Sequence, residues 1–298
     1  MKHYESVIIG HICEDRNIDH EDNEVTICGG AVLYSSASAY ALGHKVAAVT
    51  RLRKEDSARL DSFTLPREDI YVIDSEKSTS MQNKYFTADK ERRHCVCRCV
   101  GTPFSVDDIS DEYTADIYHF AGLIYGDFSN DMIKKCAEKG AVAVDVQACL
   151  RHVTNAEGEM HFEDWKDKKE MLPYITYLKT DAAEAEIMTG TSDRLEAAKI
   201  LHSWGAKEIL ITHNTEVLAY DGENAYTCPI RARNLSGRTG RGDTTFAAYI
   251  NERLTKDIPT SLLNATAIVS LKMETPGVFK GTREDVENYK KEMYADLI

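Results

Sequence analysis

The stretch GRTGRGDTTF (residues 237–246) combines three glycines with the start of a helix. Glycine lets the backbone turn tightly and approach a ligand closely. Behind the glycines, apolar residues recur at the spacing of one helix face. Unpaired N–H groups and the positive end of the helix dipole bind anions at such a point, and Gly240, Arg241 and Gly242 would present these groups. The stretch therefore predicts an anion hole for a phosphate group.

Asp243 comes directly after this predicted anion hole. A carboxylate beside a bound phosphate is electrostatically unfavourable unless it takes a proton from an attacking hydroxyl, so its position suits a general base. The alternative is that Asp243 only stabilises the first helical turn and the glycines form an ordinary tight turn. A Walker A loop and a dinucleotide-binding fingerprint are both excluded, because neither glycine pattern occurs.

Short apolar strands alternate with helices along most of the 298 residues. We expect strands at residues 7–9, 25–28, 45–49, 117–121, 141–144, 174–178 and 207–212, and helices at residues 31–42, 130–139, 181–188, 192–204, 243–256, 258–274 and 283–296. The strand, helix and strand of residues 25–49 predict a right-handed parallel crossover. This rhythm is typical of an α/β fold with a doubly wound, mostly parallel sheet, and we expect one domain over residues 1–298.

One region interrupts this rhythm. Two β-like runs, at residues 83–87 and 94–100, flank a charged turn at residues 88–93, which predicts a hairpin. Together, the segments 13–28 and 81–100 would form a small antiparallel sheet that projects from the main one. Such a sheet would serve either as a lid over a site or as the contact of a homodimer.

Composition excludes several classes of protein. The net charge is 36 basic minus 49 acidic residues, or −13, which speaks against a nucleic-acid-binding face. No apolar run is long enough for a membrane span or a signal peptide, so we expect a cytoplasmic protein. The eight cysteines should be mostly buried thiols. Cys95, Cys97 and Cys99 suggest a metal cluster, but alternate strand residues line up about 7 Å apart, which favours an apolar row.

The loop at residues 237–243 resembles the C-terminal signature of the ribokinase-like (PfkB) family of sugar and nucleoside kinases, Asp-Thr-x-Gly-Ala-Gly-Asp. Gly240, Gly242 and Asp243 match this signature, whereas Arg241 takes the place of its alanine. The resemblance implies a ribokinase-like fold. It also implies a kinase in which Asp243 is the general base and the glycine loop stabilises the transferred phosphoryl group.

Further similarities imply an acceptor site. Gly29 and Gly30, followed by a helix of small residues, resemble the family's first signature, in which glycines let a substrate hydroxyl meet the backbone. Asp15 resembles the acid that follows the family's first strand and binds sugar hydroxyls. Gln147 and Arg151 resemble the end of a strand on the substrate side.

Other matches imply metal and nucleotide sites. Asp181 and Glu184 resemble the family's Asn-x-x-Glu motif, which helps to hold Mg²⁺ and phosphates, usually through water, as Mg²⁺ prefers. The alternative is that both are ordinary acids of a first helical turn. Thr212 and Asn214 resemble the strand end that lies along the nucleotide phosphates, and Gly277 resembles the adenine-side loop.

The sequence thus predicts a kinase that uses ATP and Mg²⁺ to phosphorylate a hydroxyl of a small sugar or polyol. A nucleoside kinase of the same family is the first alternative. The second is a sensor that binds sugar or nucleotide without turnover, suggested by departures such as Tyr34 in place of the family's asparagine. Arg238 and Arg241 would either neutralise charge on the phosphoryl group or pair with surface acids, and the sequence leaves both roles open.

Overall fold

The main sheet crosses the whole protein, which we describe from a computed structural model covering residues 1–87 and 93–298. Its strands are β1 (Lys2–Ile9), β4 (Val46–Leu52), β5 (Ile70–Asp74), β8 (Tyr113–Phe120), β9 (Ala141–Asp145), β12 (Tyr177–Asp181), β13 (Glu208–Thr212), β14 (Glu216–Tyr220) and β15 (Ala225–Pro229). Their order is β15-β14-β13-β12-β9-β8-β1-β4-β5. The run from β13 to β5 is parallel, and β14 and β15 add an antiparallel edge. The carboxyl ends of the parallel strands therefore meet along one edge of the sheet.

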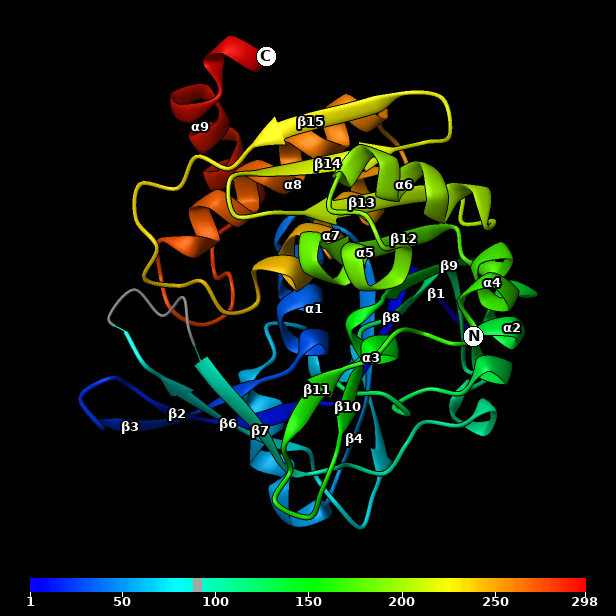
Figure 1. The fold of residues 1–298 in the computed structure, drawn as a ribbon. Helices are drawn as coiled ribbons and strands as arrows, with labels where there is room; N and C mark the ends of the chain where they lie inside the picture. The colour runs from blue at the N-terminus through cyan, green and yellow to red at the C-terminus, as the bar shows by residue number, and fades with distance from the viewer. Residues whose placement is uncertain (88–92) are drawn as a thin grey trace.

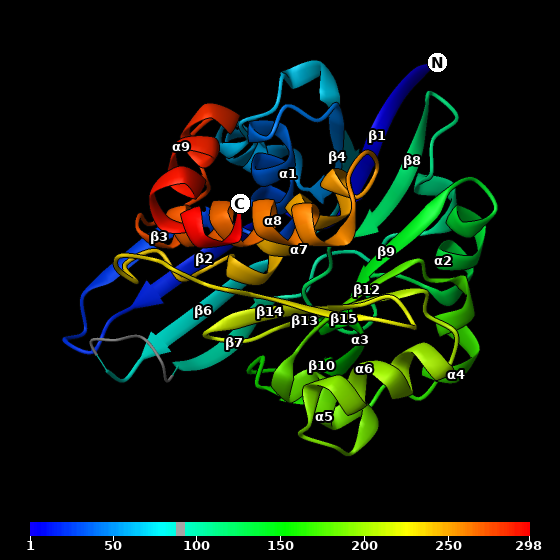
Figure 2. The ribbon, with the colours of Figure 1, turned by 90° about the horizontal axis from the view of Figure 1, so that it is seen from above.

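Helices cover both faces of this sheet (Figures 1 and 2). One layer consists of α1 (Ala31–Ala41), α7 (Arg241–Glu252), α8 (Ile258–Met273) and α9 (Arg283–Met293), and the other of α2 (Asn130–Ala137), α4 (Lys168–Met171), α5 (Ala182–Thr189) and α6 (Arg194–Ser203). The short α3 (Gln147–Leu150) follows β9, and 3-10 turns occur at Lys54–Ser62, Arg67–Asp69, Val106–Asp108, Leu172–Tyr174 and Ala295–Leu297. Among the described residues, no helix is long and apolar enough to span a bilayer.

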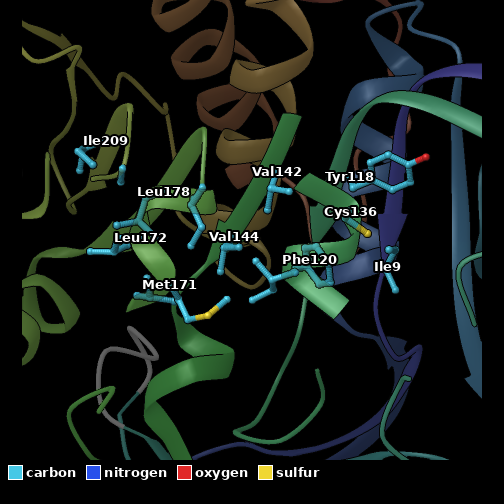
Figure 3. Packing of buried hydrophobic residues seen from close by; sticks show 14 of the residues in the cluster. Ile9, Tyr118, Phe120, Cys136, Val142, Val144, Met171, Leu172, Leu178 and Ile209 are labelled. Atoms are coloured by element: carbon cyan, nitrogen blue, oxygen red, sulfur yellow. The ribbon is translucent and has the colours of Figure 1, made fainter. Parts of the chain in front are cut away.

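The core explains why the strands read as continuous apolar runs. A parallel sheet with helices on both faces buries both sides of each strand, so its residues are apolar throughout and do not alternate between apolar and polar. Figure 3 shows one such cluster, in which Phe120, Val144 and Leu178 from neighbouring strands pack together with Met171. Phe120, Leu178 and Met171 are fully buried.

A second, smaller sheet projects from the main one (Figure 1). It contains β2 (Cys13–Ile18), β3 (Glu24–Gly29), β6 (Ser80–Tyr85) and β7 (Arg93–Cys99) in the order β3-β2-β6-β7. The outer pairings are antiparallel, whereas β2 and β6 pair in parallel. We call this sheet the lid. A separate short hairpin joins β10 (Arg151–Val153) to β11 (Met160–Phe162).

The large, mostly parallel sheet with helices on both faces confirms the predicted α/β class, but several local predictions need correction. The strand predicted at residues 25–28 belongs to the lid, so the parallel connection into β4 comes from β1. The strand predicted from residue 174 begins at Tyr177, because Leu172–Tyr174 forms a 3-10 turn. Strands β5, β14 and β15 were not predicted. The charged turn falls largely on residues 88–92, which lie outside the described residues.

Candidate active site

The loop at residues 237–242 leads into α7 and has glycine where no other residue fits. Gly240 caps the helix with φ 78°, and a Cβ there would lie 2.2 Å from the Tyr34 ring. A Cβ on Gly237 would lie 1.8 Å from the Thr275 carbonyl oxygen. A side chain would therefore collide at both positions, and at Gly240 it would also be strained by the left-handed backbone. The loop is held tightly against α1 and the end of α8.

The backbone amides at the end of this loop form the first turn of α7. The Thr244 N–H donates to the Gly240 carbonyl (2.9 Å), which is an early hydrogen bond of the helix. The Gly242 N–H comes before it, among the N–H groups that have no partner within the helix. The Arg241 N–H instead donates to the Arg238 carbonyl (3.3 Å) and closes the turn. An anion at this helix N-terminus would thus meet the Gly242 amide and the positive end of the dipole.

Asp243 lies in the first turn of α7 and is partly buried. Burial, followed by the nearby Asp145 carboxylate, raises the pKa of Asp243 to about 6, against the opposing influence of Lys179 and Arg151. A carboxylate with this pKa is still mostly ionised near neutral pH, and it is a stronger base than an ordinary aspartate. The arrangement suits proton abstraction beside an anion site.

Lys179 supplies a buried positive charge next to the loop. Its Nζ lies 2.9 Å from Asp145 Oδ2 and 3.7 Å from Glu184 Oε2. It also lies 3.1 Å from the position that a Cβ on Gly242 would take, so the ammonium faces the anion site. Burial alone would lower the pKa of Lys179, but the two carboxylates outweigh it and hold the pKa above its usual value. Lys179 therefore stays charged beside the place where phosphate would bind.

Asp181 and Glu184, the predicted metal residues, form a reciprocal cap on α5. The Glu184 N–H donates to Asp181 Oδ1 (2.8 Å), and the Asp181 N–H donates to Glu184 Oε2 (2.7 Å). Burial raises the pKa of Glu184. Each carboxylate makes these bonds through one of its two oxygens. Among the described residues, no group of three or more potential ligands is arranged to hold a metal ion directly.

Asp15 lies on the lid and is almost fully buried. Its Oδ1 accepts a hydrogen bond from Cys13 Sγ (3.1 Å), and its Oδ2 would lie 2.1 Å from a Cβ on Gly29. Gly29 therefore lets this carboxylate lie directly on the backbone that leads into α1. Burial raises the pKa of Asp15, whereas the Arg93 and Arg151 guanidinium groups act in the opposite direction.

The lid turns one face toward the same region. Asn17 lies two residues after Asp15 on β2 and pairs with Asn83 on β6, so their side chains share one face of the lid. Asn83 Nδ2 donates to Asn17 Oδ1 (3.1 Å). Within the described part of the chain, Asn83 Oδ1 and the Tyr34 hydroxyl are buried without a hydrogen-bond partner. These atoms are suited to bind the hydroxyl groups of a ligand.

Gln147 and Arg151 lie together at the carboxyl end of β9, as their predicted role requires. Arg151 Nη2 donates to Gln147 Oε1 (2.6 Å) across one turn of α3. Burial lowers the pKa of Arg151, whose nearby charged groups include Glu184 and Asp145. The structure thus brings Arg151, together with Gln147, close to the Asp145 and Glu184 carboxylates, which pair with Lys179.

The predicted nucleotide residues show three different environments. Thr212 is buried and its hydroxyl donates to the Thr180 carbonyl (3.4 Å). Asn214 Oδ1 accepts from Arg241 Nη1 (2.9 Å) and lies 3.5 Å from Arg238 Nη2. Gly277 has φ 86°, and no atom lies within 4 Å of a Cβ placed there. The two arginines therefore converge on one side-chain amide beside the anion site.

Comparison with protein families places this geometry in a known group. The model of the pfkB family carbohydrate kinases matches residues 12–284. The chain belongs to this family. It is therefore a phosphotransferase of the kinase type.

Individual relatives of this pfkB-family chain differ in donor and acceptor. A pyrophosphate-dependent kinase of the ribokinase family, solved with a pyrophosphate analog and myo-inositol, is 31% identical with a TM-score of 0.83, covering 95% of this chain and 99% of that one. A cytidine kinase of Thermococcus kodakarensis is 27% identical over 251 residues, 82% of this chain and 86% of its own. Arabidopsis thaliana ribokinase, solved with ribose and ATP, shares the fold at 17% identity and a TM-score of 0.76, covering 98% and 99%.

Three buried charged residues near the glycine loop or Asp243 were absent from the predicted set of site residues. Asp145 ends β9 and Lys179 lies in the middle of β12. A charged residue beside buried aliphatic ones in a strand is a signal that sequence reasoning could have used. Lys272 lies in α8, among small and apolar residues, and is fully buried. All three meet the glycine loop or Asp243 through tertiary contacts that chain order does not reveal.

Proposed function

We propose that this pfkB-family kinase transfers a phosphoryl group to a hydroxyl of a small sugar or polyol, with Asp243 as the general base. The observation that carries the proposal is the position of Asp243. Its carboxylate lies in the first turn of α7, next to the anion site, and its pKa is raised to about 6. Asp243 would then remove the proton of the acceptor hydroxyl, while the anion site would stabilise the negative charge of the phosphoryl group that this hydroxyl attacks.

The anion site would stabilise the phosphoryl group during its transfer. The amides of Gly240 and Gly242, together with the helix dipole, would meet this group, whereas the Arg241 N–H, which sequence analysis also assigned to the anion hole, is bonded to the Arg238 carbonyl. Lys179 would add a fixed positive charge. Such preorganised groups stabilise charge more strongly than water does, because they need not reorient during the reaction. The hydroxyl of the acceptor would approach from the lid, where Asp15 and the Gly29-Gly30 backbone would orient it.

Mg²⁺ would bind near Asp181 and Glu184 and neutralise the donor phosphates. Carboxylate oxygens are suitable partners for Mg²⁺. Because each carboxylate already accepts a backbone N–H through one oxygen, contact through water fits this pair better than a closed protein cage. Nearby, Lys179 pairs with Glu184 and limits the negative charge of the site.

The acceptor is proposed as a sugar or polyol because the polar groups facing it suit hydroxyls. Asp15, Asn83 and Gln147 offer oxygen acceptors, and Arg151 offers donors. The myo-inositol-bound relative supports this choice. A nucleoside acceptor is the alternative, supported by the similarity to a cytidine kinase.

For the donor, ATP is the proposal that follows from the family resemblance, and pyrophosphate is a second candidate. The Arg238 and Arg241 guanidinium groups converge on Asn214, where nucleotide phosphates are expected. Pyrophosphate lacks the base and ribose through which a protein can bind ATP, so a site for pyrophosphate would depend on cations such as these two guanidinium groups. The 31% identity to a pyrophosphate-dependent kinase also favours this candidate.

One experiment tests both choices. The purified chain is incubated with Mg²⁺, either ATP or pyrophosphate, and myo-inositol, ribose or cytidine, and phosphorylated products are followed by ³¹P NMR. We expect a phosphomonoester with a polyol or sugar and with at least one donor. A product from cytidine alone would establish the nucleoside alternative. Binding by calorimetry without any product would instead favour a sensor.

We also propose that the lid contacts a second copy of the chain. Strand β3 lies at the lid edge, and Val25 on it is 58% exposed. An edge strand offers unpaired backbone groups that a second strand can bind. Sedimentation velocity over a wide range of concentrations tests this, and a monomer throughout would overturn it.

A further inference from the structure

Lys272 is a buried cation beneath the glycine loop of residues 237–242. It lies one residue before the end of α8 and is fully buried. Among the described residues, no carboxylate forms an ion pair with it. A buried ammonium without an ion partner is costly unless other polar groups solvate it, so its surroundings need an explanation.

Backbone carbonyls of the loop surround this ammonium. Nζ donates to the Gly237 carbonyl oxygen (2.5 Å) and to the Thr239 carbonyl oxygen. It also lies 5.1 Å from the centre of the Tyr34 ring, within range of a cation–π contact. The Gly237 N–H meanwhile donates to the Met273 carbonyl (2.7 Å), which fixes the loop to the end of α8.

These contacts decide which way the loop amides point. In a planar trans peptide the C=O and N–H groups point in opposite directions. When Lys272 holds the Thr239 carbonyl toward the interior, the N–H of Gly240 must point away from it, toward the anion site. The same holds for the Gly237 carbonyl and the N–H of Arg238. The ammonium therefore fixes the direction of these N–H groups through the backbone.

We propose that Lys272 is a positioning residue whose ammonium holds the loop carbonyls as a bound monovalent cation would, so that turnover needs no added K⁺ or NH₄⁺. Carbonyl oxygens are the groups that replace the hydration shell of K⁺ in proteins. A tethered ammonium supplies the same charge without a binding step. The inference rests on the proposed function, because the loop is taken to be the phosphoryl site.

Chemical rescue tests this proposal. Lys272→Ala removes the ammonium and leaves space before the carbonyls, and Lys291→Ala, at an exposed lysine of α9, is the matched control. We expect kcat of Lys272→Ala to fall about 10²-fold, as when one oxyanion-hole donor is lost, with a smaller change in acceptor KM. Added NH₄⁺ or K⁺ should raise kcat of Lys272→Ala at least about tenfold. Tetramethylammonium is too large for the space and should not raise it. The wild type and Lys291→Ala should respond to none of these salts.

Two further measurements keep the inference separable from the proposed function. Calorimetry with pyrophosphate should show about tenfold weaker binding to Lys272→Ala than to Lys291→Ala, whatever the acceptor. Burial lowers the pKa of Lys272 to about 8, and Asp243 and Tyr34 are the titratable groups that face it, so wild-type kcat should decline above that pH.

Three outcomes would overturn the inference: strong K⁺ activation of the wild type, normal kcat in Lys272→Ala, or a loss that no cation restores. If Lys272→Ala does not fold, the wild-type salt and pH responses still decide. Absence of turnover with every donor and acceptor would instead contradict the proposed function.

Discussion

The two sides of the site are built in different ways. On the proposed donor side, the loop at residues 237–242 is fixed between α1 and α8, and buried Lys179 and Lys272 face it from the main body. On the proposed acceptor side, Asp15 and Asn83 project from a small lid with an exposed edge. The difference indicates two separate roles. The loop backbone and the buried lysines would stabilise the transferred phosphoryl group, and the side chains of the lid would select the acceptor.

The comparison predicts that the largest loss of turnover comes from Asp243→Asn. The amide keeps the size of the side chain but cannot accept the proton of the acceptor hydroxyl, so kcat should fall by about 10² to 10⁴. Asp131→Asn is the control, because Asp131 also lies in a first helical turn but is exposed. Near-normal kcat in Asp243→Asn would remove the base from the mechanism.

Lys179→Met should have the next largest effect and should damage stability as well. It removes the charge beside Gly242, with an expected loss of about 10² in kcat. It also leaves the buried Asp145 and Glu184 carboxylates without their cation, which typically costs about 3–5 kcal/mol in free energy of unfolding. Urea denaturation measures this cost. Lys135→Met, which breaks the exposed Lys135–Glu138 pair, should cost less than about 1 kcal/mol.

Asp15→Asn should sharpen the contrast by changing binding more than chemistry. Loss of the buried carboxylate would weaken charge-assisted hydrogen bonds to acceptor hydroxyls, so acceptor KM should rise about 10-fold or more. Donor KM should change little. Steady-state kinetics with each substrate varied in turn separates the two. A larger effect on donor KM than on acceptor KM would show that the lid does not select the acceptor.

The smallest effect is expected at the lid surface. Asp22 is exposed and pairs with Lys84 across the lid. Asp22→Asn should change the free energy of unfolding by less than about 1 kcal/mol, because exposed ion pairs contribute little. Its acceptor KM should match the wild type. If Asp22→Asn raised acceptor KM as strongly as Asp15→Asn, a general loosening of the lid would explain both.

Local and tertiary contacts also differ in how far the sequence predicts them. Gly240 and Asp243 were predictable because a glycine loop before a helix dictates its own local geometry. Lys179 and Lys272 were missed because their roles depend on strands and helices that meet only in the folded chain. The polar strand β2 was not assigned as a strand, since its pairing with β6 lies more than sixty residues away. The catalytic roles of the predicted residues stay predictions until they are measured.

The pH dependence of kcat/KM tests the role of Asp243 most directly. Because the carboxylate must be ionised to accept a proton, and its pKa is raised to about 6, kcat/KM should rise about tenfold per pH unit below that value. It should level off above that value, until the decline that follows when Lys272, with a pKa of about 8, loses its proton. In Asp243→Asn the residual rate should lack this rise. A flat wild-type profile across that range, or an unchanged rise in Asp243→Asn, would contradict the assignment.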